Sequence, residues 1–222
     1  MLKSNFIANI LKIKAIILLL IFLFIFSQPV KAVALPQAKE ATGVEITNLE
    51  AGYSFVLPDG WGELNPVLTG MYNMYVGSAA KDTDIAFLLA AYSKSGKYNL
   101  PPILFLHFMQ EPITPNLIPT YNKMFLEEAR NTADKTRVAN KIGLAKSVTF
   151  EGTKNIRPGT TALLNKAVTN FGFTAKTMTI PYYSSAGIVI LTFFAPEDEF
   201  DTLQDEFLKI ARSLNITEDK TP

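Results

Sequence analysis

The sequence predicts an α+β protein in which an antiparallel β-sheet is flanked by helices. Residues 102–110 and 188–194 form short apolar runs, which suit strands that are covered on both faces. Segments 120–131 and 198–214 instead repeat apolar residues at spacings of three and four, as helices do. Turn residues separate the remaining apolar segments, which are typical of further strands.

The first 34 residues have the three regions of a secretory signal peptide. Residues 1–14 are basic, residues 15–26 are apolar, and small residues precede possible cleavage sites after Ala32 or Ala34. The apolar stretch has 12 residues, whereas a membrane-spanning helix needs about 20. We therefore expect export and cleavage, with an uncleaved N-terminal anchor as the alternative. Because the chain has no Cys, a lipoprotein attachment site is excluded.

The rest of the chain is long enough for one domain with a sizeable core. The predicted organisation is a signal peptide at 1–34, a flexible leader at 35–46, a single domain at 47–214 and a disordered polar tail at 215–222.

The first half of the domain is predicted to be mostly strands. Strands are expected at 53–57, 71–80 and 84–94, with Pro58-Asp59-Gly60 as a turn. Trp61 follows that turn and is expected to anchor the core beside it.

Residues 102–110 (PILFLHFMQ) are the most apolar stretch after the signal peptide. Nine residues are too few for a membrane helix, so we expect a central strand. Strand periodicity places His107, the only histidine, on the same face as Phe105 and Met109. A histidine in such a strand is more often structural than catalytic, and no Ser and Asp partner can be assigned to it from spacing.

The second half of the domain is predicted to alternate between helix and strand. The expected elements are a helix at 120–131, a surface loop at 132–141, a strand at 142–151, a turn region at 152–159 and two strands at 161–170 and 173–183.

The closing segment is a strand followed by an amphipathic helix. Pro196 is expected to end the strand, and Asp198 to cap the helix through its side chain. The apolar face of the helix comprises Phe200, Leu203, Phe207, Ile210, Ala211 and Leu214. The acidic residues Glu197, Asp198, Glu199 and Asp201 could instead suggest a cation site. They lack the glycine and ligand spacing of a calcium loop, so the pattern favours helix capping and a solvated face.

Composition excludes several classes of function. Without Cys and with one His, the chain has no thiolate zinc site, cysteine nucleophile or multi-histidine metal site. Without the four lysines of residues 1–34, 17 basic residues face 20 acidic ones, a formal charge of −3. This balance gives no reason to expect a nucleic acid or an anionic membrane surface as partner. No phosphate loop, nucleophile elbow or internal repeat is present.

The chain resembles the Mog1/PsbP-like superfamily in two segments. One is Tyr53-Ser54-Phe55-Val56-Leu57-Pro58-Asp59-Gly60-Trp61, and the other is the strand 188–196 with the helix positions Glu199, Phe200 and 207–214. The resemblance extends over about residues 45–215 and includes exported bacterial DcrB-like and PsbP-like proteins. It implies an α/β/α sandwich and an accessory or binding role without catalytic machinery. No photosystem-specific motif is present, so that role is not carried over.

Three functions compete at this stage. The first is an exported, non-enzymatic accessory or binding protein of the cell envelope, periplasmic or secreted, that acts through an unidentified protein partner. The second is a binder of a small apolar ligand, suggested by aromatic and Met residues at 71–75, 103–109 and 121–125; ordinary core packing is the favoured explanation of these residues. The third and most remote is a hydrolase that uses His107. We assign no catalytic, cofactor-binding or metal-ligating residue and expect no cofactor.

Overall fold

The structure is a computed structural model of the whole chain. It describes residues 43–48, 52–64, 70, 86–98, 100–109, 113–141, 145–184 and 187–216. The predicted signal peptide, most of the predicted leader and the predicted strand at 71–80 lie outside the described residues.

The elements follow one another in the order strands, helices, strands and closing helix. Their bounds are β1 (Val44–Asn48), β2 (Tyr53–Leu57), β3 (Trp61–Glu63), β4 (Ala86–Lys94), β5 (Ile103–Met109), the 3-10 turn η1 (Pro115–Leu117), α3 (Ile118–Arg130), α4 (Thr132–Lys141), β6 (Ala145–Arg157), β7 (Thr160–Thr169), β8 (Thr174–Tyr183), β9 (Ile188–Pro196), α5 (Glu197–Ser213) and β10 (Asn215–Ile216).

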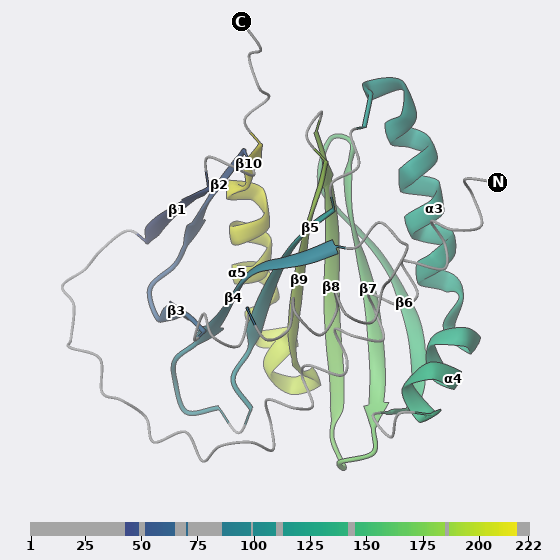
Figure 1. Ribbon diagram of the computed structural model, residues 1–222. Helices are drawn as coiled ribbons and strands as arrows, with labels where there is room; N and C mark the ends of the chain where they lie inside the picture. Colours follow the sequence, from purple (N-terminus) through teal and green to yellow (C-terminus); the bar gives the residue numbers. More distant parts are fainter. Residues whose placement is uncertain are drawn as a thin grey trace, which may run out of the picture.

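A seven-stranded antiparallel sheet forms the middle layer of the molecule (Figure 1). Its strand order is β3-β4-β5-β9-β8-β7-β6, so the closing strand β9 is central and pairs with β5 and β8 along its length. Every residue of β9 except Pro196 is buried. The absence of charge in this strand therefore follows from coverage on both faces, as predicted.

One face of the large sheet is covered by α5 and by a small sheet of order β1-β2-β10 (Figure 1). The core on this side joins Phe55 of β2, Leu104 of β5, Phe193 of β9 and Phe207 of α5. The apolar face predicted for the closing helix is buried throughout, which confirms the prediction from its spacing. Tyr182 adds a hydrogen bond of 2.5 Å from its hydroxyl to the carbonyl oxygen of Ala211.

The other face is covered by α3 and α4, which completes an α/β/α arrangement (Figure 1). Phe125 and Ala129 of α3 pack in a second core with Phe105 of β5 and Ile190 of β9. The predicted α+β class and helix-flanked antiparallel sheet are thus confirmed.

The prediction of a surface loop at 132–141 was wrong, because this segment is the helix α4. Helix α4 packs against β6, the edge strand of the large sheet, and its apolar contact there is Ala139 against Val148. Because this contact is small, the sequence of α4 carries no long apolar stripe. Polar contacts replace the missing apolar stripe: Thr136 Oγ1 accepts from the backbone nitrogen of Val148 at 2.8 Å, and Lys135 donates to Ala129 O at 2.7 Å.

The predicted turn region at 152–159 was also mostly wrong. Strand β6 continues to Arg157, and only the connection to β7 at residues 158–159 turns. Gly152 has φ of 144° and lies where the β6–β7 register shifts. Gly152 therefore marks a bulge inside the strand, where a positive φ is needed, and does not mark the end of the strand.

Both ends of the domain extend further than predicted. Val44–Asn48, partly within the segment expected as a flexible leader, pairs with β2, and Asn215–Ile216, expected as tail, pairs with the other edge of β2. Ser213 Oγ adds a hydrogen bond of 2.9 Å from the backbone nitrogen of Val56. These long-range partners order segments whose composition alone is polar.

Candidate functional site

His107 lies in the middle of β5 and is completely buried. Its strand pairs it with Ile190 of β9, and the Phe105 ring lies 6.2 Å away between centroids. Burial lowers the pKa of His107 to about 3, so the imidazole is neutral at physiological pH. The structure therefore places this residue in the core, as expected for a structural histidine.

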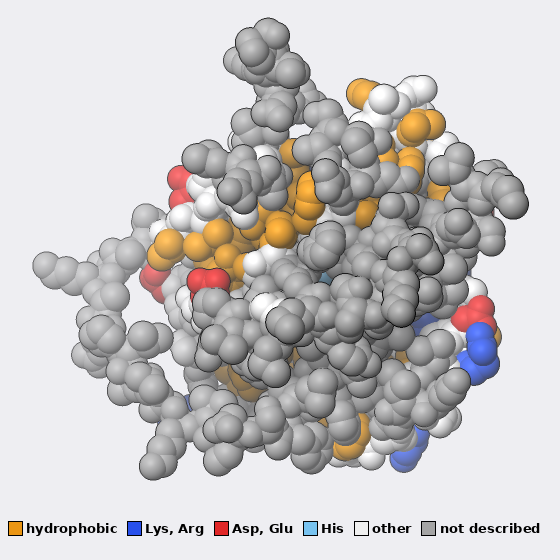
Figure 2. Space-filling view, in the orientation of Figure 1, with side chains coloured by type: hydrophobic (Ala, Val, Ile, Leu, Met, Phe, Trp, Pro, Cys, Tyr) orange, Lys and Arg blue, Asp and Glu red, His pale blue; other side chains and the backbone are white. Residues whose placement is uncertain are grey.

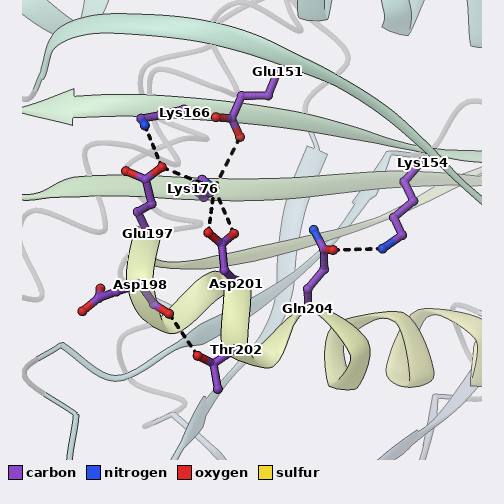
Figure 3. Close-up of polar contacts among 9 residues, drawn as sticks. All are labelled: Glu151, Lys154, Lys166, Lys176, Glu197, Asp198, Asp201, Thr202 and Gln204. Carbon is purple, nitrogen blue, oxygen red and sulfur yellow. Dashed lines mark hydrogen bonds and ion pairs between the residues drawn. The ribbon is translucent and has the colours of Figure 1, made fainter.

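The acidic start of α5 contacts basic side chains of the large sheet (Figure 3). Lys166 Nζ lies 2.6 Å and Lys176 Nζ 3.3 Å from Glu197 Oε1, and Lys176 also donates to both oxygens of Asp201 at 2.9 and 3.1 Å. Glu151 approaches Lys176 at 3.9 Å. We call Glu151, Lys166, Lys176, Glu197 and Asp201 the ion-pair cluster.

The two lysines of the ion-pair cluster change the protonation and the charge balance of its carboxylates. The hydrogen bond from Lys166 holds the pKa of Glu197 below its usual value, and the hydrogen bond to Asp201 raises the pKa of Lys176. Ammonium groups therefore already balance the charge of the Glu197 and Asp201 carboxylates. The cluster is therefore suited to fastening the first turns of α5 onto β7 and β8.

The sequence identified Glu197 and Asp201 of the ion-pair cluster but neither Glu151 nor the two lysines. Lys166 and Lys176 are directly opposite each other on β7 and β8, which only strand pairing reveals. The capping role predicted for Asp198 was wrong: α5 begins at Glu197, after Pro196, without a side-chain cap. Asp198 is in the first turn, where its charge still favours the positive end of the helix dipole.

Of the segments suggested for apolar ligand binding, 121–125 packs in the core facing α3, 103–109 contributes to the cores on both faces of the sheet, and 71–75 lies outside the described residues. Phe125 is fully packed in the core facing α3, and Tyr121 and Met124 are half-buried against the same cluster. Tyr121 and Phe125 both lie near the ring of Tyr183, at 6.3 Å between centroids. These residues stabilise the attachment of α3 to the sheet.

Exposed apolar side chains are found at margins of the fold. Val44 is 60% exposed and Val56 is 37% exposed, both on the small sheet, while Val168 and Phe171 are exposed at the β7–β8 hairpin. Figure 2 shows hydrophobic side chains gathered in the region of the small sheet. Strand β1 is an edge strand whose one neighbour among the described elements is β2.

Within the described ranges, no group of three or more His, Cys, Asp or Glu side chains is arranged to hold a metal ion. None of the helices in that part of the chain combines the length and apolarity required to cross a bilayer.

No protein-family model matches the sequence, and no curated protein is significantly similar to it. The structure is similar to the solution structure of cyanobacterial PsbP (CyanoP) from Synechocystis sp. PCC 6803, with a TM-score of 0.50 and 11% sequence identity over 83% of this chain and 98% of that chain. The crystal structure of LpqN, which is involved in cell envelope biogenesis of Mycobacterium tuberculosis, matches with a TM-score of 0.40 and 16% identity over 80% of this chain and 86% of that chain. The similarity to CyanoP shows that this chain has the PsbP-like fold. The resemblance carried by the first strand, its turn and the closing strand and helix is thereby confirmed for the fold.

Proposed function

We propose that this protein is an exported, non-enzymatic accessory protein of the cell envelope that acts by binding a protein partner. The predicted signal peptide supports export. The PsbP-like fold supports an accessory role by analogy only, since one fold hosts many functions.

The observation that carries the non-enzymatic part of the proposal is the position of His107. A general base must reach the proton that it abstracts and must titrate near the working pH. His107 is fully buried and its pKa is lowered to about 3. The carboxylates of the ion-pair cluster are engaged by Lys166 and Lys176, which suits a structural role better than proton transfer.

The small sheet offers a place for a partner. An edge strand presents unpaired backbone N–H and C=O groups, which an extended segment of another protein can use by adding a strand. The outer edge of β1 has this property, and Val44 and Val56 add exposed apolar contact area beside it.

Site-specific photocrosslinking in cells of the source organism tests this proposal. A photoreactive residue is placed at Val44 and, as a matched control, at Lys123, whose side chain is 76% exposed on α3. We expect one envelope protein to crosslink at Val44 and not at Lys123, and the same complex to form with the variant His107→Gln. Equal crosslinking at both positions, or none at Val44, would contradict partner binding at the small sheet. N-terminal sequencing tests export, because an exported form that begins at Met1 would contradict cleavage.

A further inference from the structure

The face of the large sheet toward α3 carries a continuous row of polar side chains. Its members lie on four neighbouring strands, and we call them the polar stripe: Asn165, Thr177, Thr179, Thr192 and His107. Register places Thr177 opposite Asn165 and Thr179 opposite Thr192. Thr192 also lies opposite Phe105, two residues from His107 on β5. Directly opposed residues have Cβ atoms about 4.5–5.5 Å apart and diagonal neighbours, such as Thr192 and His107, lie about 7–8 Å apart, so each member of the row has another member as a neighbour.

The two central strands of this row, β5 and β9, are entirely apolar on their other face. The residues that point toward α5 from β5, β8 and β9 are Leu104, Leu106, Met178, Ile180, Leu191 and Phe193, all fully buried. Thr192 and Thr179 are also buried, at 2% and 8% exposure. In the central strands β5 and β9, polarity is therefore confined to the face toward α3, although both faces are buried there.

Two oxygen atoms of the polar stripe have no hydrogen-bond partner. They are Thr192 Oγ1 and Asn165 Oδ1, and both atoms are buried. Leaving a buried polar atom unpaired costs about 1–3 kcal/mol, and buried polar atoms in native proteins nearly always have a partner. A Val in place of Thr192 would fill the same shape without this cost.

We propose that the polar stripe around Thr192 binds a neutral, apolar molecule that carries a hydroxyl group, and that this hydroxyl forms a hydrogen bond with Thr192 Oγ1. This inference goes beyond the proposed partner binding and does not depend on it. A hydroxyl suits Thr192 because each group can both donate and accept. Sites for small molecules are mostly apolar with a few placed polar groups, which describes Thr192 among Phe105, Ile190 and Phe194.

The charge of the surroundings selects a neutral ligand. The side chains of the polar stripe are uncharged, because burial lowers the pKa of His107 to about 3 and the other members do not ionise. A carboxylate or an ammonium ion would lose its hydration there without an opposite charge from the stripe, which is costly. A fatty alcohol is therefore favoured over the fatty acid of the same length.

Binding of 1-octanol to the mature protein tests the inference, with octanoate as the charged comparison. We expect 1-octanol to raise the melting temperature and to shift the NMR methyl signals of Ile190 and Thr192, and octanoate to bind at least tenfold more weakly. In Thr192→Val we expect at least a tenfold weaker affinity for 1-octanol. The matched control Thr174→Val lies on the same sheet outside the polar stripe, and it should bind as the wild type does.

The melting temperature of Thr192→Val without ligand distinguishes a ligand-binding role of the Thr192 hydroxyl from a structural role. Because Thr192 Oγ1 has no partner, Thr192→Val should melt at or above the temperature of the wild type while losing the ligand. A clear drop in its melting temperature would overturn the inference. Absence of 1-octanol binding to the wild type, or equal binding by Thr192→Val, would overturn it as well.

Discussion

The indole nitrogen of Trp61 donates a hydrogen bond of 2.5 Å to Glu206 Oε1, which connects the edge strand β3 to the closing helix α5. Lys94 Nζ lies 2.5 Å from the same oxygen, and the Trp61 ring meets Phe207 edge-on at 6.1 Å between centroids. One carboxylate on α5 thus holds two neighbouring strands. Trp61, predicted as a core anchor beside the turn, is half-buried and packs against the core through this contact.

We predict that Trp61→Phe destabilises the protein by about 1–2 kcal/mol, because it keeps an aromatic ring but removes the donor to a charged acceptor. Urea unfolding of the mature protein measures the change. Glu206→Gln is the comparison: it keeps an acceptor for Trp61 and loses only the partly exposed ion pair with Lys94, which is worth at most about 1 kcal/mol. A Trp61→Phe variant as stable as the wild type would show that the hydrogen bond contributes nothing.

Phe207→Ala is predicted to cost about 3–5 kcal/mol, the range for removing a large aromatic side chain from a core. Phe207 is fully buried and lies 4.8 Å from the Phe193 ring and 5.2 Å from the Phe200 ring, between centroids. Urea unfolding again gives the value. On the exposed side of the same helix, Asp205→Ala should cost under about 0.5 kcal/mol. Similar losses in both variants would contradict the assignment of α5 as the covering helix of this core.

We predict that the protein loses stability at pH values above those at which its carboxylates titrate, because the buried His107 must remain neutral in the folded state. Its pKa is 6.5 in the unfolded chain and about 3 in the folded protein, so the stability gained from the neutral form is complete above pH 6.5 and is lost as the pH falls toward 3. At 1.36 kcal/mol per pH unit, about 2 kcal/mol should disappear between pH 7 and pH 5. Urea unfolding across this range should show the loss in the wild type and not in His107→Gln.

An NMR titration of the wild type provides a second readout that needs no variant. The imidazole C–H signals of the single histidine should stay constant between pH 7 and pH 5 while the protein is folded. A titration centred near pH 6.5 would mean that His107 is accessible and would remove the main argument against general-base chemistry.

Chelation is predicted to leave stability unchanged. The chain has no Cys and one His, and the carboxylates at the start of α5 pair with Lys166 and Lys176. The melting temperature of the mature protein should therefore be the same with and without EDTA. A decrease of more than about 2–4 °C, which corresponds to roughly 1 kcal/mol in a domain of this size, would reveal an oxygen-ligand site.

Sequence patterns predicted elements well where periodicity and burial agree. The apolar run of β9 and the three-and-four spacing of α5 identified both elements, because a long covered face leaves a long pattern. Prediction failed for α4, whose buried apolar face is little more than Ala139. Its polar contacts are a hydrogen bond that Thr136 accepts from the backbone nitrogen of Val148 and one that Lys135 donates to Ala129 O. The alanines and basic residues of α4 favour a helix, and this propensity is a signal that hydrophobic spacing does not contain.

The candidate sites were less predictable than the elements. Strand periodicity placed His107 in the core, but the partners of Glu197 and Asp201 come from β7 and β8, which pair only in the folded sheet. The polar stripe likewise joins residues from four strands. No spacing along the chain brings Asn165 and Thr192 into one row.

The sequence by itself determined the secondary structure of the closing strand and helix, the exclusion of cysteine chemistry and of multi-histidine metal sites, and the burial of His107, because local periodicity and residue type suffice for these. Only the tertiary structure decided the strand order around β9, the recruitment of Val44–Asn48 and Asn215–Ile216 to β2, and the grouping of Thr192 with His107 on one face. These depend on backbone hydrogen bonds between segments far apart in the chain, and a backbone hydrogen bond leaves no mark on the identity of the residues that it joins.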